Sequence, residues 1–513
     1  MHGTGIKQLW TGTLTVLHNL KCLDLSNCKN LIEIPDLTGA QNLEEIYLTG
    51  CINLCEIHPS IKVLKQIQKI VMHGTGIKQL WTGTLAVLHN LKCLYLSNCK
   101  NLIEIPDLSG APNLEIIDLR DCTSLCEVHP SIYELKRLKY LGCTNLCEIH
   151  PSIKVLKQIQ IMVMDGTGIK QLWTGTLAQV LHNLKSLDLR NCKNLMEIPD
   201  LTGAQNLEEI YLTGCLNLCE IHPSIKVLKQ IQKIVMHGTG IKQLWMGTLA
   251  VLHNLKCLDL SNCKNMIEIP DLTGVQNLEE IYLTGCINLC EIHPSIKVLK
   301  QIQKIVMHGN GIKQLWTGTL AVLHNLKILN LSNCKNLIEI PDLTRAQNLG
   351  EIYFTGCTSL CEVHPSIKVL KQIQRIVMAG TGIKQLWTGT LAVLHNLKCL
   401  YLSNCKNLIE IPDLSGAPNL EIIDLRDCTS LCEVHPSIKV LKQIQKIIMI
   451  GIGIKQIWTG TLVVLENLKY LILNQSKNLI KKPDLSGAPN LEIIDLTDCT
   501  SLFEVHPSIY ELK

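Results

Sequence analysis

Aromatic residues are scarce in this chain of 513 residues, which has 2 Phe, 10 Tyr and 7 Trp, together 4% of the sequence. A core with so few rings must be filled by leucine and isoleucine, which favours many small, similar layers over one large globular centre. An excess of charge is also missing, because 48 basic and 44 acidic residues leave a formal charge of +4. This balance predicts neither nucleic-acid binding nor attraction to a membrane surface.

Long apolar runs and a targeting segment are missing as well. The longest apolar run, Ile447–Ile454, lies between two lysines and is too short to span a bilayer. The opening MHGTGIKQLW lacks the basic region, the apolar region and the cleavage site of a secretory signal. We therefore expect a soluble protein of the cytoplasm, or of the cytoplasm and nucleus, with no membrane partner.

Internal repeats dominate the sequence. Its seven tryptophans stand at 10, 81, 173, 245, 316, 387 and 458, mostly 71 or 72 positions apart, and residues 20–90 differ from 255–325 at three of 71 positions. One wider interval of 92 positions contains an extra unit, residues 138–158. Self-similarity at a fixed period is typical of a solenoid.

Each 71-residue block divides into three units, represented by residues 20–42, 43–66 and 67–90. All three follow LxxLxLxx(C/T)xxL, which is the signature of a leucine-rich repeat. The predicted fold class is therefore α/β, a leucine-rich-repeat solenoid (horseshoe) with parallel strands on the concave face and short helices and loops on the convex face. We expect one domain over residues 1–513, with about 22 repeats in 71-residue triplets and no cap at either end.

The spacing also predicts local structure. The LxLx stretch alternates with period two and indicates a short strand with one face in the core. Residues 58–70 carry apolar positions between lysines, and we expect a short convex helix that starts at Pro59 and Ser60. The irregular unit 138–158 is predicted to have lost residues from its strand and to be the weakest joint of the solenoid.

Three phrases are more specific than a generic repeat: IKQLWTGTL (77–85), CKNLIEIPDLSGAPNLEIIDL (99–119) and DCTSLCEVHPSI (121–132). In this order they resemble the leucine-rich repeats of plant Toll/interleukin-receptor-type nucleotide-binding disease resistance proteins. The resemblance implies a non-catalytic module for recognition or autoinhibition in defence signalling. Its implied partner is a protein: a pathogen effector, a guarded host protein, or the nucleotide-binding domain of the same receptor.

Two departures from that family stand out. The family is expected to carry this trio of phrases once, whereas here it recurs in every block, so the chain resembles a tandem expansion. Residues 74–79 (GTGIKQ) lack the GxxxxGK[ST] pattern that cradles phosphates, so we expect no nucleotide and no other cofactor. Met1 aligns with Met72 and Lys513 with Lys136, both inside a unit, from which we expect a fragment of a longer receptor.

Cysteine is abundant, and its number, 25, is odd, so complete pairing into disulfides is impossible. Cys51, Cys55 and His58 resemble part of a zinc motif. However, Cys51 is predicted to face the interior of its coil and Cys55 to face outward, so the two cannot share a metal, and a fourth ligand is missing. We expect reduced thiols and no metal.

An active site copied along a rod is implausible, so no catalytic residues are predicted.

The outward positions of the strands are the third, fifth and seventh of each unit. Glu45 and Lys69 should lie side by side on neighbouring strands, unlike the uniformly basic face that nucleic acid needs. Tyrosine, aspartate and arginine on this concave face suit protein recognition. The candidate protein-binding residues are Tyr47, Tyr95, Asp118, Arg120, Asp188, Arg190, Tyr211, Asp259, Tyr282, Tyr353, Tyr401 and Asp424. The lysines at 62 and 65, with their copies, should form a second, convex stripe.

Two other functions stay open at this stage. The near-identity of the blocks favours a purely structural or non-functional expansion, since specific recognition usually needs a differentiated surface. An extracellular leucine-rich-repeat receptor domain is the other alternative, although the phrase IPDLTGAQNL lacks the LxGxIP pattern of such domains.

Overall fold

The computed structural model describes residues 1–10, 17–81, 87–147, 150, 152–153, 156–172, 181–244, 252–316, 323–387, 394–457, 465–481 and 484–503. These residues divide into two compact units. Unit 1 contains the described residues up to Leu255, and unit 2 contains those from Lys256 onward. The predicted fold class is confirmed, because each unit is a stack of coils joined by parallel strands.

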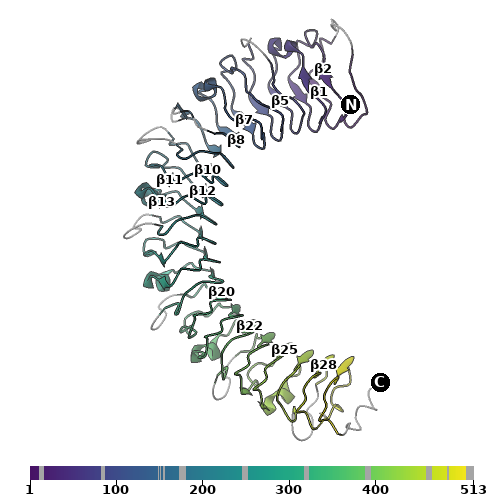
Figure 1. Cartoon of the computed structure of the whole chain (residues 1–513), viewed down its shortest axis with the longest axis vertical. Helices are drawn as coiled ribbons and strands as arrows, with labels where there is room; N and C mark the ends of the chain where they lie inside the picture. The colour runs from purple at the N-terminus through teal and green to yellow at the C-terminus, as the bar shows by residue number, and fades with distance from the viewer. Residues whose placement is uncertain are drawn as a thin grey trace. The chain divides into compact units, whose positions relative to one another are not determined.

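In unit 1, each coil adds one short strand to a parallel ladder that lines the inner side of the unit (Figure 1). The pairing is in register, so that Cys22, Leu23 and Asp24 face Glu45, Ile46 and Tyr47. In order along the ladder, the strands are β1 (Cys22–Asp24), β3 (Glu45–Tyr47), β5 (Lys69–Val71), β6 (Cys93–Tyr95), β7 (Ile116–Leu119), β8 (Tyr140–Cys143), β9 (Ile161–Val163), β10 (Ser186–Asp188), β12 (Glu209–Tyr211) and β14 (Lys233–Val235).

Unit 2 repeats this arrangement. Its ladder consists of β15 (Cys257–Asp259), β17 (Glu280–Tyr282), β19 (Lys304–Val306), β20 (Ile328–Asn330), β21 (Glu351–Tyr353), β22 (Arg375–Val377), β23 (Cys399–Tyr401), β25 (Ile422–Asp424), β27 (Lys446–Ile448), β28 (Tyr470–Ile472) and β29 (Ile493–Asp495). The count of about 22 repeats stays a prediction.

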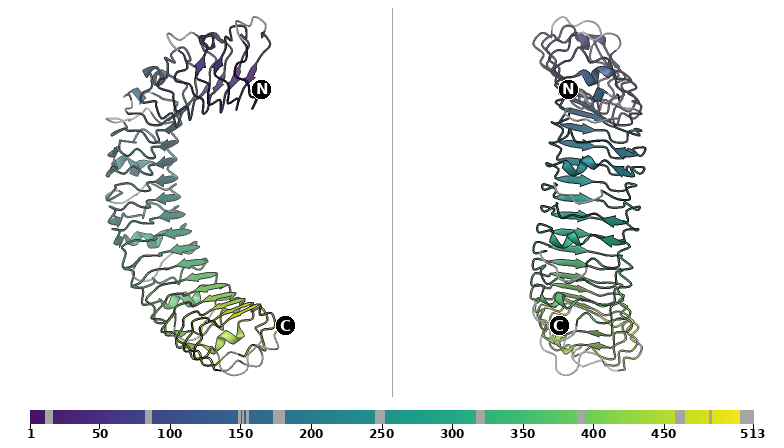
Figure 2. Two further views of the ribbon diagram at one scale, coloured as in Figure 1. Left: turned by 45° about the vertical axis from the view of Figure 1, so that its right-hand side comes forward. Right: turned by 90° about the vertical axis from the view of Figure 1, so that its left-hand side faces the viewer.

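The opposite side of the coils carries short two-stranded pairs and 3-10 helices (Figure 2). The pairs are β2 (Glu33–Ile34) with β4 (Glu56–Ile57), β11 (Glu197–Ile198) with β13 (Glu220–Ile221), β16 (Glu268–Ile269) with β18 (Glu291–Ile292), and β24 (Glu410–Ile411) with β26 (Glu433–Val434). The helices are η1 (Pro59–Val63), η2 (Pro130–Glu134), η4 (Pro223–Val227), η5 (Pro294–Val298), η6 (Pro365–Val369) and η7 (Pro436–Val440).

The helix expected within residues 58–70 is thus a single 3-10 helix, η1. His58 caps it, because its Nδ1 accepts the N–H of Ser60 at 3.2 Å. The Ser60 hydroxyl in turn accepts the N–H of Leu37, one coil earlier, at 2.8 Å. This hydrogen bond between coils holds the start of the helix at the predicted Pro-Ser step. The helix stays short because the following Leu64 returns to the core.

The interior of each coil is a closed ring of apolar side chains. In the first block, the leucines of the strand and of the following turns, Leu25, Leu31 and Leu43, have 0% of their surface exposed. Since equivalent leucines of adjacent coils occupy equivalent sites, each coil covers the apolar interior of the next. Burial of this kind stabilises by about 25 cal/mol per Å² of apolar surface, and no coil obtains it alone.

Buried cysteines form a column inside the coils, next to the leucines. The Cys51 thiol donates to the carbonyl oxygen of Leu25, one coil earlier, at 3.1 Å, and Cys122 makes the same bond to Leu96. Thr75 replaces cysteine in the third unit and bonds to Met72 O at 3.2 Å. Burial raises the pKa of Cys51 to about 11 and that of Cys122 to about 12. As predicted, Cys51 faces inward, while Cys55 is exposed.

The irregular unit corrects one prediction. Its strand, β8, has four residues and pairs with both β7 and β9, so it is complete. The missing residues come from the turn that follows: Cys143 takes the buried place of a strand leucine, and only Thr144 and Asn145 separate it from buried Leu146. Loss of turn residues leaves the ladder intact, because strand hydrogen bonds do not depend on turn length. That this unit is the weakest joint stays a prediction.

The described tryptophans pack into the coils. Trp81, Trp316 and Trp387 are 4%, 6% and 5% exposed, while Trp10 in the first coil is partly exposed. Trp173, Trp245 and Trp458 lie outside the described residues.

We expect Trp387→Ala to lower the free energy of unfolding by roughly 3 kcal/mol, because it leaves a cavity in the stack. Trp387→Phe should cost less, since the indole N–H of Trp387 has no hydrogen-bond partner among the described residues to lose. Urea unfolding followed by circular dichroism measures both, with Trp10→Ala as the control. Equal midpoints for Trp387→Ala and the unmodified chain would show that the ring does not support the stack.

The buried and the exposed cysteines should differ in their reactivity. Between pH 7 and 9, buried thiols such as Cys51 and Cys286 should stay protonated and unmodified, because burial raises their pKa, whereas the exposed cysteines react. Alkylation of the reduced native chain, followed by peptide mass spectrometry, locates each modified residue. In denaturant, all 25 cysteines should react. Modification of Cys51 or Cys286 in the native chain at the rate of Cys55 would contradict the buried column.

Candidate protein-binding surface

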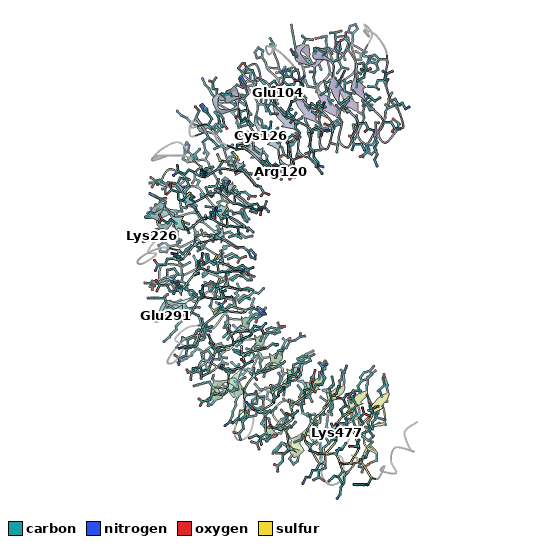
Figure 3. The ribbon with its side chains drawn as sticks, in the orientation of Figure 1. Glu104, Arg120, Cys126, Lys226, Glu291 and Lys477 are labelled. Carbon is teal, nitrogen blue, oxygen red and sulfur yellow. The ribbon has the colours of Figure 1, made fainter. Side chains whose placement is uncertain are left out.

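The strand ladder of each unit presents one open surface, which we call the strand face: the side chains at the third, fifth and seventh positions of the units. Figure 3 labels Arg120 on this inner side and Lys226, in η4, on the outer side. On a strand, these alternate positions point away from the buried leucines between them. Such side chains form columns, since the coils are in register.

A cluster of glutamate, tyrosine and lysine recurs on the strand face. Glu45 and Lys69 are register partners on β3 and β5, which confirms the predicted neighbours. Tyr47 donates its hydroxyl to Glu45 Oε2 at 3.0 Å, and Lys69 Nζ lies 5.1 Å from the centre of the Tyr47 ring. The glutamate and the ammonium group thus hold the ring from two sides, the latter through a cation–π interaction.

The cluster is repeated with nearly the same distances. Tyr211 bonds to Glu209 at 3.0 Å with Lys233 at 5.3 Å from its ring, and Tyr282 bonds to Glu280 at 3.0 Å with Lys304 at 5.0 Å. At Tyr353 the hydroxyl bonds to Glu351 at 2.7 Å, and Arg375 is the cationic register partner of that glutamate.

Two copies of the cluster are extended by a second tyrosine. Lys69 Nζ lies 5.9 Å from the Tyr95 ring as well, so it bridges two aromatic rings. The ring of His73 lies 5.9 Å from that of Tyr95. In unit 2, Val377 of β22 is the register partner of both Tyr353 and Tyr401, which gives the same order of residues.

The charge states within the cluster are set by its neighbours. Hydrogen bonding to Tyr47 raises the pKa of Lys69, so the lysine is charged at neutral pH. Burial raises the pKa of Tyr95, Tyr211 and Tyr282, so their hydroxyls stay protonated and can donate. The rings are half-buried, with their outer parts open to solvent.

The predicted aspartates are placed differently. Asp118, Asp188 and Asp424 are 2%, 7% and 1% exposed, so the prediction that they present carboxylates on the surface is wrong. Each lies beneath the arginine two positions later: Arg120 Nε and Nη2 each donate to Asp118 at 2.9 Å. Arg190 and Arg426 bind Asp188 and Asp424 in the same way. A side chain at i+2 lies on the same strand face, and the guanidinium fork matches a carboxylate.

What these positions offer to a partner is therefore the arginine. Arg120, Arg190 and Arg426 are exposed at their outer edge, and the aspartate beneath raises the pKa of each guanidinium. Asp259 has Ser261 instead of arginine at i+2, and it remains partly exposed and accepts the Ser261 N–H at 2.9 Å. Asp259 is thus the one predicted aspartate that keeps an open carboxylate on the strand face.

Histidines, possible metal ligands and hollows outside the strand face are also candidates for a site. The histidines at 58, 129, 222, 293, 364 and 435 cap 3-10 helices. Within the described ranges, no three histidine, cysteine or acidic side chains are placed to share a metal ion. Two hollows of about 290 and 260 Å³ recur at equivalent places beside Trp316 and Trp387, so they are features of the repeat.

Among the described residues, no helix has the length and apolar character needed to cross a membrane.

Comparison with known proteins agrees with this architecture. The Leucine Rich Repeat family model matches residues 19–40, 183–204 and 254–274. Disease resistance protein RPP5 of Arabidopsis thaliana is 29% identical over 97% of this chain and 33% of its own length. RPP4 of the same plant is 30% identical over 72% of the chain and 31% of its own length. TMV resistance protein N of Nicotiana glutinosa is 28% identical over 72% of the chain and 28% of its own length.

The chain carries leucine-rich repeats similar to those of plant disease resistance proteins. The family resemblance that three phrases of the sequence indicated is thereby confirmed over most of this chain. Among solved structures, YopM from Yersinia enterocolitica aligns with a TM-score of 0.51 at 17% identity, over 93% of this chain and 82% of its own, which supports the solenoid fold alone. The chain spans about a third of the length of the disease resistance proteins named here.

The arginine pairs of these repeats give a stability prediction. Arg426→Ser should lower the free energy of unfolding by about 1–3 kcal/mol, because the Asp424 carboxylate loses the guanidinium group that pairs with it. The chain supplies the matched rescue: β20 has Asn330 followed by Ser332, whose N–H donates to Asn330 Oδ1 at 3.0 Å. The double variant Asp424→Asn/Arg426→Ser should therefore recover most of the loss. A double variant no more stable than Arg426→Ser would show that the unpaired charge of Asp424 is not the cause.

Proposed function

We propose that this chain is a non-catalytic, protein-binding leucine-rich-repeat region of a plant immune receptor, and that its strand face makes the contact. The similarity to disease resistance proteins supports the class of protein. The observation that carries the choice of surface is the recurring Glu–Tyr–Lys cluster, which occurs on the open side of the ladder in both units.

The physical case rests on preorganisation. A tyrosine ring brings a large contact area with few rotatable bonds, and interfaces favour it for that reason. Here the ring is already held by a hydrogen bond to glutamate and by an ammonium group, so little further side-chain entropy is lost when a partner binds. The exposed edge of the nearby arginines supplies donors for a partner's carboxylates or backbone carbonyls.

Because the cluster is repeated, one partner can contact several copies of it. The same cluster recurs at Tyr47, Tyr211 and Tyr282, and a version with Arg375 in place of lysine occurs at Tyr353. A partner that contacts two clusters gains avidity through effective concentration, even if each contact is weak. Nearly identical blocks can thus raise the affinity for one partner. The three candidate partners are those implied by the family: a pathogen effector, a guarded host protein, and the nucleotide-binding domain of the same receptor, in the cytoplasm or nucleus.

The test is a serine substitution of the six tyrosines at 47, 95, 211, 282, 353 and 401. Because their rings are only half-buried and the leucines beneath are untouched, the variant should keep its circular dichroism spectrum and unfold at a somewhat lower midpoint. Binding should be lost, by at least tenfold for each partner that the unmodified chain retains from plant extract. Quantitative mass spectrometry of the retained proteins gives the readout.

The matched control lies on the other side of the coils. The lysines at 65, 229, 300, 371 and 442 are exposed outside the ladder, and their substitution by serine should change only the salt dependence of binding. Retention of the same partners by the tyrosine variant would overturn the assignment of the strand face.

A structural or non-functional expansion is the competing proposal, supported by the near-identity of the blocks. It predicts that neither variant differs from the unmodified chain in the proteins that it retains.

A further inference from the structure

The irregular unit brings together two cysteines that the regular repeat keeps apart. Residues 121–132 and 143–153 both contain the phrase that ends in Cys-x2-His-Pro-Ser-Ile, with Cys126 in one coil and Cys147 in the next. In the regular triplet this phrase occurs once every three coils. The extra unit therefore places two copies of it on adjacent coils within unit 1.

The backbone fixes how close the two residues are. The N–H of Cys147 donates to the carbonyl oxygen of Cys126 at 3.1 Å, so the residues are direct neighbours across the coil boundary. Neighbours joined in this way have Cα atoms about 5 Å apart. That separation falls within the range that a disulfide requires, about 4.4–6.8 Å between Cα atoms.

The other exposed cysteines of this column have a different neighbour. The N–H of Cys55 donates to Ile32 O at 2.9 Å, and that of Cys219 donates to Met196 O at 3.1 Å. The N–H groups of Cys290, Cys361 and Cys432 donate to the carbonyl oxygens of Ile267, Ile338 and Ile409 in the same way. Among the described residues, only Cys147 of this column has a cysteine at that place.

Accessibility and local backbone both suit a reaction. Cys126 and Cys147 are exposed, unlike the pairs in the buried column, such as Cys28 and Cys51. Side chains on paired, in-register strands point the same way, which hinders a disulfide. However, the described residues Glu127 and Val128 that follow Cys126 carry no strand, whereas Cys55 is followed directly by β4.

We propose that Cys126 and Cys147 are a reactive dithiol that hydrogen peroxide converts to a disulfide between adjacent coils. One thiolate attacks peroxide, which breaks the O–O bond, forms a sulfenic acid and releases water. The second thiol attacks the sulfenic sulfur; the S–S bond forms, the S–O bond breaks, and a second water leaves with the remaining proton. The two thiols lose two electrons, and peroxide gains them.

The disulfide would tie the irregular unit to the coil before it, beside the shortened turn after β8. A crosslink between adjacent coils opposes their separation, so oxidation should raise the unfolding temperature of the chain. Cellular thiols such as glutathione reverse the bond, because an exposed disulfide is open to thiol exchange.

The experiment uses the full chain, reduced and then freed of reductant. It is treated with graded hydrogen peroxide, alkylated, and digested with trypsin without reduction. We expect a linked peptide pair, residues 121–136 with residues 140–154, to form while Cys55 and Cys219 remain alkylatable. The unfolding temperature should rise on oxidation and return on addition of glutathione.

Cys122 and Cys143 lie in the same peptides, so variants decide which thiols react. Cys126→Ser and Cys147→Ser should each abolish the linked pair and the temperature shift, while Cys219→Ser should leave both unchanged. Survival of the linked pair in Cys126→Ser, or oxidation of Cys126 and Cys147 only to separate sulfinic acids, would overturn the proposal. So would one zinc ion per chain that is retained by the reduced protein and lost in both variants, since the pair would then be part of a metal site.

Discussion

The in-register stacking of one coil on the next is the interaction on which the rest of the structure depends. A coil has a closed apolar ring, with residues such as Leu25 and Leu31 at 0% exposure, but its two flat sides are covered only by neighbouring coils. The strand hydrogen bonds, the thiol-to-carbonyl bond of Cys51 and the bond from Leu37 N–H to Ser60 all cross the same boundary. Stability is therefore a property of adjacent pairs of coils.

Stacking also decides what the surface can be. Because register partners lie in columns, a residue type that recurs in the sequence recurs as a neighbour in space. Glu45, Tyr47 and Lys69 come from two coils and form one cluster, and the following blocks repeat it. The surface chemistry of such a protein thus changes mainly where the order of units changes. The extra unit after residue 137 is the example, since it sets Cys147 against Cys126 in place of an isoleucine or methionine.

Burial on the strand face is decided by pairs of side chains rather than by strand position alone. Asp118 and Asp259 occupy equivalent places, yet one is buried and the other is partly exposed. The difference is the residue two positions later, arginine in one and serine in the other. Arginine can fold back over the carboxylate because both side chains lie on the same face of the strand.

The sequence by itself determined the coil, because a period of 23 or 24 residues with fixed apolar positions allows one way to bury them. It also predicted that Cys51 faces inward, that Cys55 faces outward, and that Glu45 lies beside Lys69, since these depend only on strand alternation and register. Three features required the tertiary structure: the 3-10 form of Pro59–Val63, the burial of Asp118 under Arg120, and the complete strand of the irregular unit. Each depends on where a side chain or a turn settles against the next coil, and a repeat pattern carries no information about that contact.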